Sequence, residues 1–296
     1  MSARYLLAAL SLATGSAAPS LAQPAAPNAQ AQWTRQCKDW DDWDKAGPPF
    51  RVSANTYYVG TCGISAVLIV GDQGDVLIDG GPANAGDLVA ANIKALGIKL
   101  SDVKILLHTH EHHDHVGGLA RLKQLTGARL YASSAAAQAL ESGSPSRDDP
   151  QYAEHGRFPA VRVDKRLDGN ATVTLGGLTL KGFATPGHTS GAMSWQWQSC
   201  QGSACQTVVY ADSLTPVSSD GYRFSDHPEA LASFRGSLIT VGSLPCDILL
   251  SPHPSASRMR DRLLNGNLVD QRACWNYADG LKKQLDERLT KEANGG

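Results

Sequence analysis

The sequence predicts an α/β protein, because two patterns of apolar residues alternate along the chain. Short runs of branched apolar residues, typical of buried strands, alternate with longer stretches whose apolar residues recur at helical spacing. This alternation occurs twice, with strands first and helices later in each half. The chain has 296 residues, of which 42% are hydrophobic, so one large domain or two small ones are possible. We expect one domain over residues 23–296.

The first half begins with hairpin-like strands and continues with alternating helices and strands. A turn of sequence Gly-Asp-Gln-Gly joins the second strand to the third, which favours a hairpin. Strands are predicted at 55–59, 65–70, 76–79, 103–107 and 129–131, and helices at 86–96, 117–125 and 134–141. Residues 142–159 are rich in Ser, Asp and Pro and lack a period. A loop of that length is usually functional or mobile, and we expect it to flank the active site.

The second half repeats the same plan. Its first two strands flank the turn Gly176-Gly177. Strands are predicted at 171–175, 178–183, 193–198, 206–211 and 246–251, and helices at 228–241 and 269–289.

The N-terminal residues predict export. Residues 1–22 contain Arg4, a mostly apolar run and small residues before Gln23, which is the pattern of a secretory signal peptide. A retained membrane or lipid anchor is the alternative, but the apolar run is too short to span a bilayer and no Cys follows the cleavage site. We therefore expect a periplasmic protein in which residues 23–33, rich in Ala, Pro and Gln, form a flexible leader.

The charge balance excludes several classes of partner. Lys and Arg number 27 against 28 Asp and Glu, so no basic surplus points to nucleic acid. Past the N-terminus, no apolar run is long enough for a membrane span. We expect a monomer that acts on a small molecule, with neither nucleic acid nor membrane as a partner.

Six cysteines in an exported chain favour disulfides. Cys200 and Cys205 flank a turn-like segment between two predicted strands, which makes them the safest pair. By elimination, Cys37 is paired with Cys62 and Cys246 with Cys274. A zinc site made of thiolates is disfavoured because the chain has no C-x-x-C pair.

A histidine-rich stretch marks the predicted site. Residues 108–115 contain five of the nine histidines and two carboxylates. The stretch lies between the predicted strand 103–107 and a helix start, unlike the disordered histidine tracts that bind metal loosely. Because alternate side chains of an extended segment share a face, His110 and His112 can bind one cation, while Asp114 and His115 face a second.

Two further histidines can complete these sites. His188 lies in a Thr-Pro-Gly-His-Thr turn directly after a predicted strand, and His253 follows another strand within Ser-Pro-His-Pro. A lone loop histidine is more often solvated, but sheet proteins collect ligands at strand ends.

The whole pattern resembles the metallo-β-lactamase superfamily, over nearly all of the mature chain. It comprises His110-x-His112-x-Asp114-His115, Asp79 at a strand end, His188 and His253. The resemblance implies an αββα sandwich, in which two mixed β-sheets pack face to face with helices on both outer faces. Within the superfamily, Ala-Asp-Ser-Leu-Thr at 211–215, with Ser213 in place of a metal-binding Cys, is most similar to subclass B3.

The resemblance also implies the ligands and the reaction. Two Zn²⁺ ions would be bound, one by His110, His112 and His188, the other by Asp114, His115 and His253. Ser213 and Thr215 would contact the substrate carboxylate or a zinc-bound water. The implied activity is hydrolysis of the amide bond of penicillins, cephalosporins and carbapenems by a hydroxide that bridges the metals, after which a water near Asp114 returns a proton.

Several residues near these ligands receive other roles. Asp212 is expected to be a hydrogen-bond partner of a ligand, with a metal-bridging role as the alternative. Asp79 and His108 are expected to be buried and hydrogen-bonded, and His113 to line the cleft wall. Glu111 is left as a polar group of the cleft. His155 and His227 are expected to be ordinary loop histidines.

Two alternative functions remain open from the residues. An exported lactonase or thioesterase-like hydrolase would use the same metals on the same fold. A non-catalytic zinc-storage protein would also bind metal, although ligands confined to ordered strand ends argue against it.

Overall fold

Two β-sheets form the centre of the computed structural model, which describes residues 29–295. The predicted signal peptide and residues 23–28 of the expected leader lie outside these residues. The first sheet has seven strands in chain order: β1 (Phe50–Ser53), β2 (Thr56–Tyr58), β3 (Val67–Ile69), β4 (Asp75–Ile78), β5 (Val103–Leu107), β6 (Arg129–Ser133) and β7 (Lys165–Leu167). Strands β1 to β4 are antiparallel neighbours and β4 to β7 are parallel neighbours.

The second sheet has five strands in the order β12-β11-β10-β9-β8. Their bounds are β8 (Ala171–Leu175), β9 (Leu178–Ala184), β10 (Met193–Gln201), β11 (Ala204–Tyr210) and β12 (Ile248–Leu250). Strands β8 to β11 are antiparallel, whereas β12 runs parallel to β11. Both sheets are therefore mixed.

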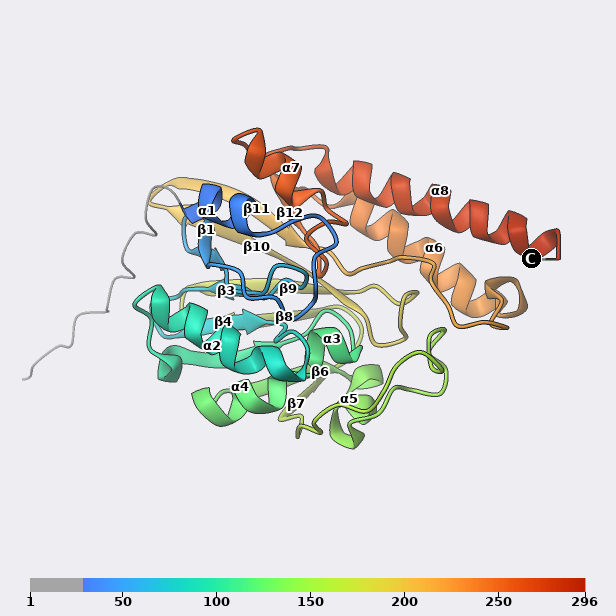
Figure 1. Cartoon of the computed structure of the whole chain (residues 1–296), viewed down its shortest axis with the longest axis horizontal. Helices are drawn as coiled ribbons and strands as arrows, with labels where there is room; N and C mark the ends of the chain where they lie inside the picture. The colour runs from blue at the N-terminus through green and yellow to red at the C-terminus, as the bar shows by residue number, and fades with distance from the viewer. Residues whose placement is uncertain (1–28, 296) are drawn as a thin grey trace, which may run out of the picture.

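Helices cover the outer faces of both sheets, as Figure 1 shows. The helices of the described residues are α1 (Ala29–Gln36), α2 (Gly86–Ala95), α3 (His113–Val116), α4 (Leu119–Thr126), α5 (Ser134–Ser142), α6 (Pro228–Ser243), α7 (Met259–Leu264) and α8 (Ala273–Ala293), with short 3₁₀ turns η1 (Ala83–Ala85), η2 (Leu100–Asp102) and η3 (Phe224–Asp226). Helices α2, α4 and α5 pack on the seven-stranded sheet, and α6 and α8 lie side by side on the five-stranded one. The αββα sandwich is confirmed.

The main hydrophobic core lies between the two sheets. Trp195 from the second sheet and Phe50 and Tyr58 from the first are completely buried there, and the two rings from the first sheet stack 5.1 Å apart. Burial of each such side chain stabilises the fold by about 1.5–3 kcal/mol. Because this core joins the sheets, it also fixes the strand ends that carry the predicted ligands.

The expected flexible leader is wrong for residues 29–33, which belong to α1. Trp33 of this helix is 1% exposed and packs edge-on against Phe50 and Tyr58. The surrounding Ala and Gln residues suggested a loose segment, but the burial of one large aromatic side chain anchors the helix.

The predicted strands and helices correspond to observed ones, with a few differences. The prediction missed β1, β7, α1, α3 and α7. Strand β7 has the sequence Lys-Arg-Leu, with two exposed charged residues at a sheet edge, so it lacks an apolar run. Helix α8 begins at Ala273 instead of residue 269, because Val269 forms a β-bridge with Ile248.

All six cysteines form disulfides, and the three predicted pairs are confirmed: Cys37 with Cys62, Cys200 with Cys205 and Cys246 with Cys274. Among residues 29–295, no helix combines the length and the apolar character that crossing a bilayer requires.

Candidate metal centre

The structure brings the six predicted ligands together at one edge of the sandwich, where strands from both sheets end. His110 and His112 follow β5, His188 follows β9 and His253 follows β12. Asp114 and His115 lie in α3, a single turn of helix directly after the extended segment. Residues far apart in the chain therefore converge because the parallel strands β4 and β5 end together and the second sheet packs against them.

Asp79 holds the backbone of the histidine stretch in place. One carboxylate oxygen accepts a hydrogen bond from the Thr109 backbone N–H at 2.8 Å, and the other accepts from the hydroxyls of Thr109 and Tyr210 at 2.9 and 2.8 Å. Asp79 is fully buried, with a left-handed backbone φ of 66°. Its predicted role as a buried hydrogen-bond partner is confirmed, and it links the ends of β4, β5 and β11.

Glycines after the ligands allow a close approach of two segments. The Gly118 backbone N–H donates to the Gly81 carbonyl, and the Gly80 N–H donates to the His115 carbonyl, both at 2.9 Å. A Cβ atom on Gly118 would lie 2.2 Å from the Gly80 oxygen, which is far too close. The Gly-Gly pair after the histidines therefore lets α3 and α4 pack directly on the segment that follows β4.

The first ligand group consists of His110, His112 and His188, whose ligand atoms all lie within 4.8 Å of one another. Each ring also has a hydrogen-bond partner on one nitrogen. Nδ1 of His110 lies 2.8 Å from Asp212, Nε2 of His112 lies 2.8 Å from Asp149, and Nδ1 of His188 lies 3.0 Å from the Thr215 carbonyl oxygen. Such partners fix the tautomer, so that the second nitrogen can bind a cation. In His188 that second nitrogen, Nε2, lies 3.5 Å from Nε2 of Gln151.

The second group consists of Asp114, His115 and His253, again with ligand atoms within 4.8 Å. Asp114 Oδ2 lies 3.0 Å from Nε2 of His115 and 3.5 Å from Nε2 of His253. The rings of His110 and His115 are only 4.2 Å apart between centroids, so the two groups are adjacent.

Buried polar atoms without partners indicate that the two groups suit metal ions. Nε2 of His110, Oδ1 of Asp114 and both ring nitrogens of His115 are buried and make no hydrogen bond within residues 29–295. A buried polar atom left unpaired costs about 1–3 kcal/mol, so such a concentration needs an explanation. Imidazole and carboxylate together are typical zinc ligands, and the two clusters can hold metal ions.

Burial keeps most of the histidines neutral, which metal binding requires. It lowers the pKa of His110 and His112 well below the ordinary value, and lowers the pKa of His188 and of His253 to about 3. His115 is the exception. Burial alone would lower its pKa, but the adjacent Asp114 carboxylate outweighs this effect and raises it.

The predicted substrate-binding residues belong to a segment that contacts the first group through Asp212 and Thr215. Ser213 is buried, and its hydroxyl oxygen has no hydrogen-bond partner in the described part of the chain, whereas Thr215 Oγ1 lies 3.1 Å from Nδ1 of His188. The Tyr277 hydroxyl of α8 donates to the carbonyls of Asp212 and Ser213, which holds this segment against the helix.

Glu111 is 1% exposed and belongs to neither ligand group. It accepts hydrogen bonds from the Thr189 hydroxyl at 2.7 Å and the Gly191 N–H at 3.0 Å. Burial raises the pKa of Glu111 to about 7. The sequence left its role open, and the structure shows that it ties the histidine stretch to the turn after His188.

The expectation for His155 as an ordinary loop histidine is wrong. Its ring stacks on His112 at 3.8 Å, and its Nδ1 lies 2.9 Å from Nδ1 of His113. His155 even forms a third possible ligand group with His112 and Asp114. The signal available in the sequence was the unusual length of the loop 142–159, which also supplies Asp149 and Gln151.

The remaining histidines occupy the predicted kinds of position. His108 is fully buried, and its Nε2 accepts from the Ser133 N–H. His113 is half-buried beside Trp43, an exposed tryptophan that also lies 6.0 Å from the His253 ring and that sequence analysis did not single out. His227 stacks on Tyr222 at the start of α6.

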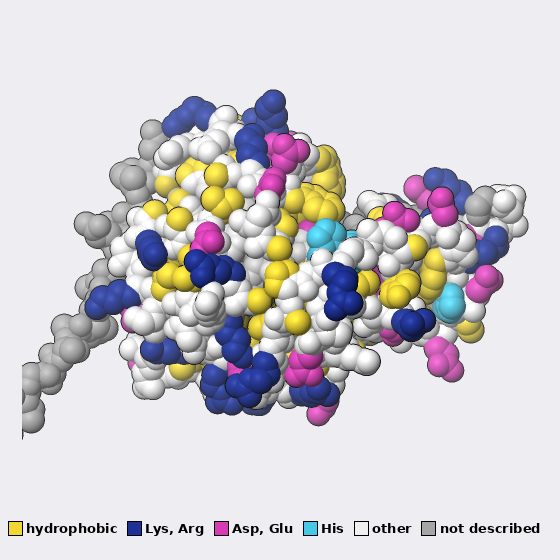
Figure 2. Space-filling model, turned by 60° about the horizontal axis from the view of Figure 1, so that its bottom comes forward, with side chains coloured by type: hydrophobic (Ala, Val, Ile, Leu, Met, Phe, Trp, Pro, Cys, Tyr) yellow, Lys and Arg dark blue, Asp and Glu magenta, His cyan; other side chains and the backbone are white. Residues whose placement is uncertain are grey.

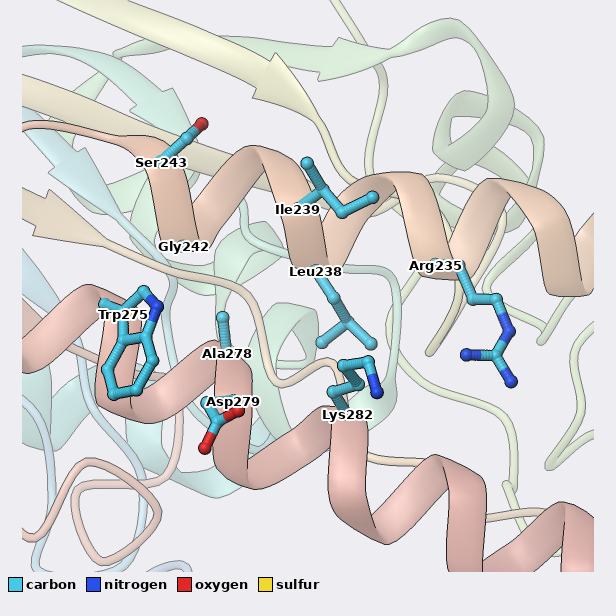
Figure 3. A pocket seen from close by; sticks show the side chains of 9 residues that line it. All are labelled: Arg235, Leu238, Ile239, Gly242, Ser243, Trp275, Ala278, Asp279 and Lys282. Atoms are coloured by element: carbon cyan, nitrogen blue, oxygen red, sulfur yellow. The ribbon is translucent and has the colours of Figure 1, made fainter.

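Because most of the histidines are buried, few of them reach the surface. On the face drawn in Figure 2, histidine shows only in small patches, one of them in the recess between the rounded body and the projecting end of the molecule. A separate groove of about 400 Å³ lies between α6 and α8, lined by Leu238, Ile239, Trp275 and Lys282 among others (Figure 3). Its lining includes no histidine, so it is distinct from the ligand groups.

Comparison with known proteins agrees with this geometry. The sequence model of the metallo-beta-lactamase superfamily matches residues 59–201. The MIM-2 metallo-beta-lactamase is 53% identical, with a TM-score of 0.87 over 91% of this chain and 100% of that one. MEM-A1, a subclass B3 metallo-beta-lactamase from a soil metagenome library, is 39% identical, with a TM-score of 0.80 over 86% of this chain and 100% of that one.

The chain belongs to the subclass B3 metallo-β-lactamases. Membership of this superfamily assigns it to the hydrolases. Curated relatives are more distant: the hydroxyacylglutathione hydrolase of Anaeromyxobacter dehalogenans is 34% identical over 122 residues, which is 41% of this chain and 37% of that protein. The matches span less than half the length of the first such relatives.

Proposed function

We propose that this metallo-β-lactamase hydrolyses the amide bond of penicillins, cephalosporins and carbapenems with two zinc ions. The observation that carries the proposal is the adjacency of two three-residue ligand groups, His110, His112 and His188 beside Asp114, His115 and His253. The similarity to MIM-2 over that protein's whole length supports the choice of substrate class.

The residues present fit two Zn²⁺ ions. Five ligands are imidazoles and one is a carboxylate, a donor set that zinc takes readily. Bound there, the ions would supply a nucleophilic hydroxide near neutral pH and polarise the carbonyl of the substrate. With Asp114 as the single carboxylate among six ligands, the loaded site would keep a net positive charge, which suits an anionic β-lactam.

The chain's own side chains complete the reaction. Thr215 lies beside His188, and Ser213 has a buried hydroxyl without a hydrogen-bond partner among the described residues, so these two side chains would bind the substrate carboxylate. Asp114 Oδ1 is buried and has no hydrogen-bond partner among the described residues, so it would accept a hydrogen bond from the water that returns a proton to the amide nitrogen when the C–N bond breaks. The Trp43 ring, beside His253, would line the entrance.

We also propose that the protein is exported and works in the periplasm as a monomer. Three disulfides support an oxidising compartment, since cytosolic thiols are usually kept reduced. The resemblance of residues 1–22 to a signal peptide agrees with that location.

Thioester hydrolysis is the alternative, and similarity to hydroxyacylglutathione hydrolases favours it in part. In that family an Asp that bridges both metals is expected, and Asp212 would be the candidate. Its Oδ1 instead lies 2.8 Å from Nδ1 of His110, which argues against a bridging role. A lactone remains a further candidate substrate for the same site.

The decisive experiment measures zinc content and hydrolysis of a carbapenem, a penicillin, a lactone and a glutathione thioester by the same preparation. We expect two zinc ions per chain, rapid opening of both β-lactams, and loss of activity with a chelator. His188→Ala should lose zinc and turnover, while His227→Ala, a histidine outside both ligand groups, serves as the matched control. Faster turnover of the thioester or lactone than of either β-lactam would overturn the proposal.

A further inference from the structure

The long loop between α5 and β7, residues 143–164, contacts one of the proposed metal ligands, His112. Its ends are tied to α5, because Phe158 N–H donates to the Gly143 carbonyl and Val161 N–H donates to the Leu140 carbonyl. Its middle is bound to the segment before α6, because the Ser219 N–H donates to the Pro150 carbonyl at 2.8 Å. Three backbone hydrogen bonds therefore fix the loop, in addition to its contact with His112.

Asp149 makes the decisive contact. It is 4% exposed, and its two carboxylate oxygens have different partners. Oδ2 lies 2.8 Å from Nε2 of His112, and Oδ1 accepts a hydrogen bond from the Gln151 backbone N–H at 2.7 Å. No Lys or Arg of the described chain forms an ion pair with Asp149. Its carboxylate therefore binds only the His112 ring and the Gln151 N–H of its own turn among the described residues.

The contact decides which nitrogen of His112 is free. A carboxylate accepts hydrogen bonds, so Nε2 of His112 carries the proton and Nδ1 keeps its lone pair. The His155 ring, stacked on His112 with an interplanar angle of 29°, restricts rotation of the same imidazole. Both constraints come from the loop and act on one ligand of the first group.

We propose that Asp149 is a positioning residue that fixes the tautomer and the orientation of His112, and thereby sets the metal affinity of the His110, His112 and His188 group. The inference rests on the proposed metal binding by this group. It separates the two metal positions, because Asp149 has no hydrogen bond or ion pair with Asp114, His115 or His253 among the described residues.

Asp149→Asn is the sharpest test, because asparagine has the same shape but one oxygen is replaced by an NH₂ donor. If that donor faces His112, it favours the opposite tautomer and protonates the nitrogen needed for metal. If the side-chain amide is rotated by 180°, its NH₂ group faces the Gln151 N–H, and the hydrogen bond to that N–H is lost. Either orientation therefore leaves one contact broken.

The matched control is Asp148→Asn, the same change at the adjacent, exposed position. Zinc affinity is measured for both positions by competition with a chromophoric chelator, and Co²⁺ spectra report the environment of each ion. In Asp149→Asn we expect about 10- to 100-fold weaker binding of one of the two ions, and unchanged binding of the other. Asp148→Asn should match the unmodified protein.

The zinc titrations can contradict the inference in two ways. Two ions bound as tightly in Asp149→Asn as in the unmodified protein would overturn the inference, and so would equal weakening of both ions in a protein that melts normally without metal. If Asp149→Asn fails to fold, Asp149→Ala is measured instead, with the same selective loss expected. The metal readout is independent of β-lactam turnover, so a protein that binds two zinc ions without opening β-lactams would refute the proposed function and leave this inference standing.

Discussion

Asp212 Oδ1 lies 2.8 Å from Nδ1 of His110, on the side of the ring opposite the buried, unpaired Nε2. The Ser194 hydroxyl accepts from the Asp212 N–H, and the Tyr277 hydroxyl donates to its carbonyl, so the residue is held at both ends of its backbone. This arrangement supports the expected role as a hydrogen-bond partner and gives no support to a bridging role.

Asp212→Ala tests that distinction. Loss of the carboxylate removes the partner of Nδ1, so we expect the ion of the His110, His112 and His188 group to bind about 10- to 100-fold more weakly. The ion of the Asp114, His115 and His253 group should bind normally. Zinc titration against a chelator measures both, and an equal loss of the two ions would mean that Asp212 is a shared ligand.

Gly118→Ala should destabilise the protein and disturb metal binding together. The added methyl group would lie 2.2 Å from the Gly80 carbonyl oxygen, so backbone must move, at a cost of about 1–3 kcal/mol or more. Because Gly118 follows the histidine stretch directly, the shift would reach α3. The free energy of unfolding, from urea titration of the metal-free protein, measures the effect.

Gly236→Ala is the control for that change. This glycine is exposed within α6, and an added Cβ meets nothing within 4 Å. Alanine is the better helix former by up to about 1 kcal/mol, so this variant should be slightly more stable. If Gly118→Ala were as stable as Gly236→Ala, the close approach would have no structural importance.

Much of the site could be predicted because its ligands follow strands with strong local signals. The apolar runs before His110, His188 and His253 mark strand ends, and the observed β5, β9 and β12 end where expected. The same apolar patterns predict most strands and helices of the sandwich. At these residues, the strand ends that the local sequence predicts are also the strand ends at which the folded sheets bring the ligands together.

Asp149 and His155 could not be predicted in the same way. Both lie in a segment without apolar periodicity, and the Asp149 contact with His112 joins residues 37 positions apart. Contacts of this kind depend on how the loop folds back across the sheet edge. Trp33 shows the converse effect, because a single buried aromatic ring orders a helix whose other residues suggested a flexible segment.

The disulfides should contribute unequally to stability. Cys246 and Cys274 are 28 residues apart, whereas Cys200 and Cys205 are separated by only 5. The entropy of loop closure in the unfolded chain predicts about 3.6 kcal/mol for the longer loop and about 2 kcal/mol for the shorter one. We expect the double Cys→Ala variant of the longer loop to melt at the lower temperature. Equal melting temperatures of the two double variants would contradict the loop-length argument.

The end of α8 should show a defined pH dependence of stability through Glu292. Its buried carboxylate accepts from the backbone N–H groups of Phe224 and Ser225 at 3.0 and 2.9 Å and from the Arg288 guanidinium at 2.9 Å. Although burial alone would raise the pKa of Glu292, these hydrogen bonds outweigh it and hold the pKa at about 2, below the ordinary 4.5. The carboxylate therefore fastens the end of α8 to η3.

Because the folded pKa lies below the unfolded one, this stabilisation is complete above about pH 4.5 and is lost as the pH falls towards 2. Glu292→Gln should lower the free energy of unfolding by about 1–3 kcal/mol at pH 7, and the difference from the unmodified protein should shrink as the pH falls below 4.5. Urea titrations of metal-free protein at several pH values measure this, and because both proteins contain the same histidine ligands, the titration of those histidines cancels in the difference between them. Glu287→Gln, an exposed position of the same helix, should change stability little at any pH. A Glu292→Gln deficit that stays constant from pH 7 down to pH 3 would show that the charge of Glu292 is not what holds the helix end.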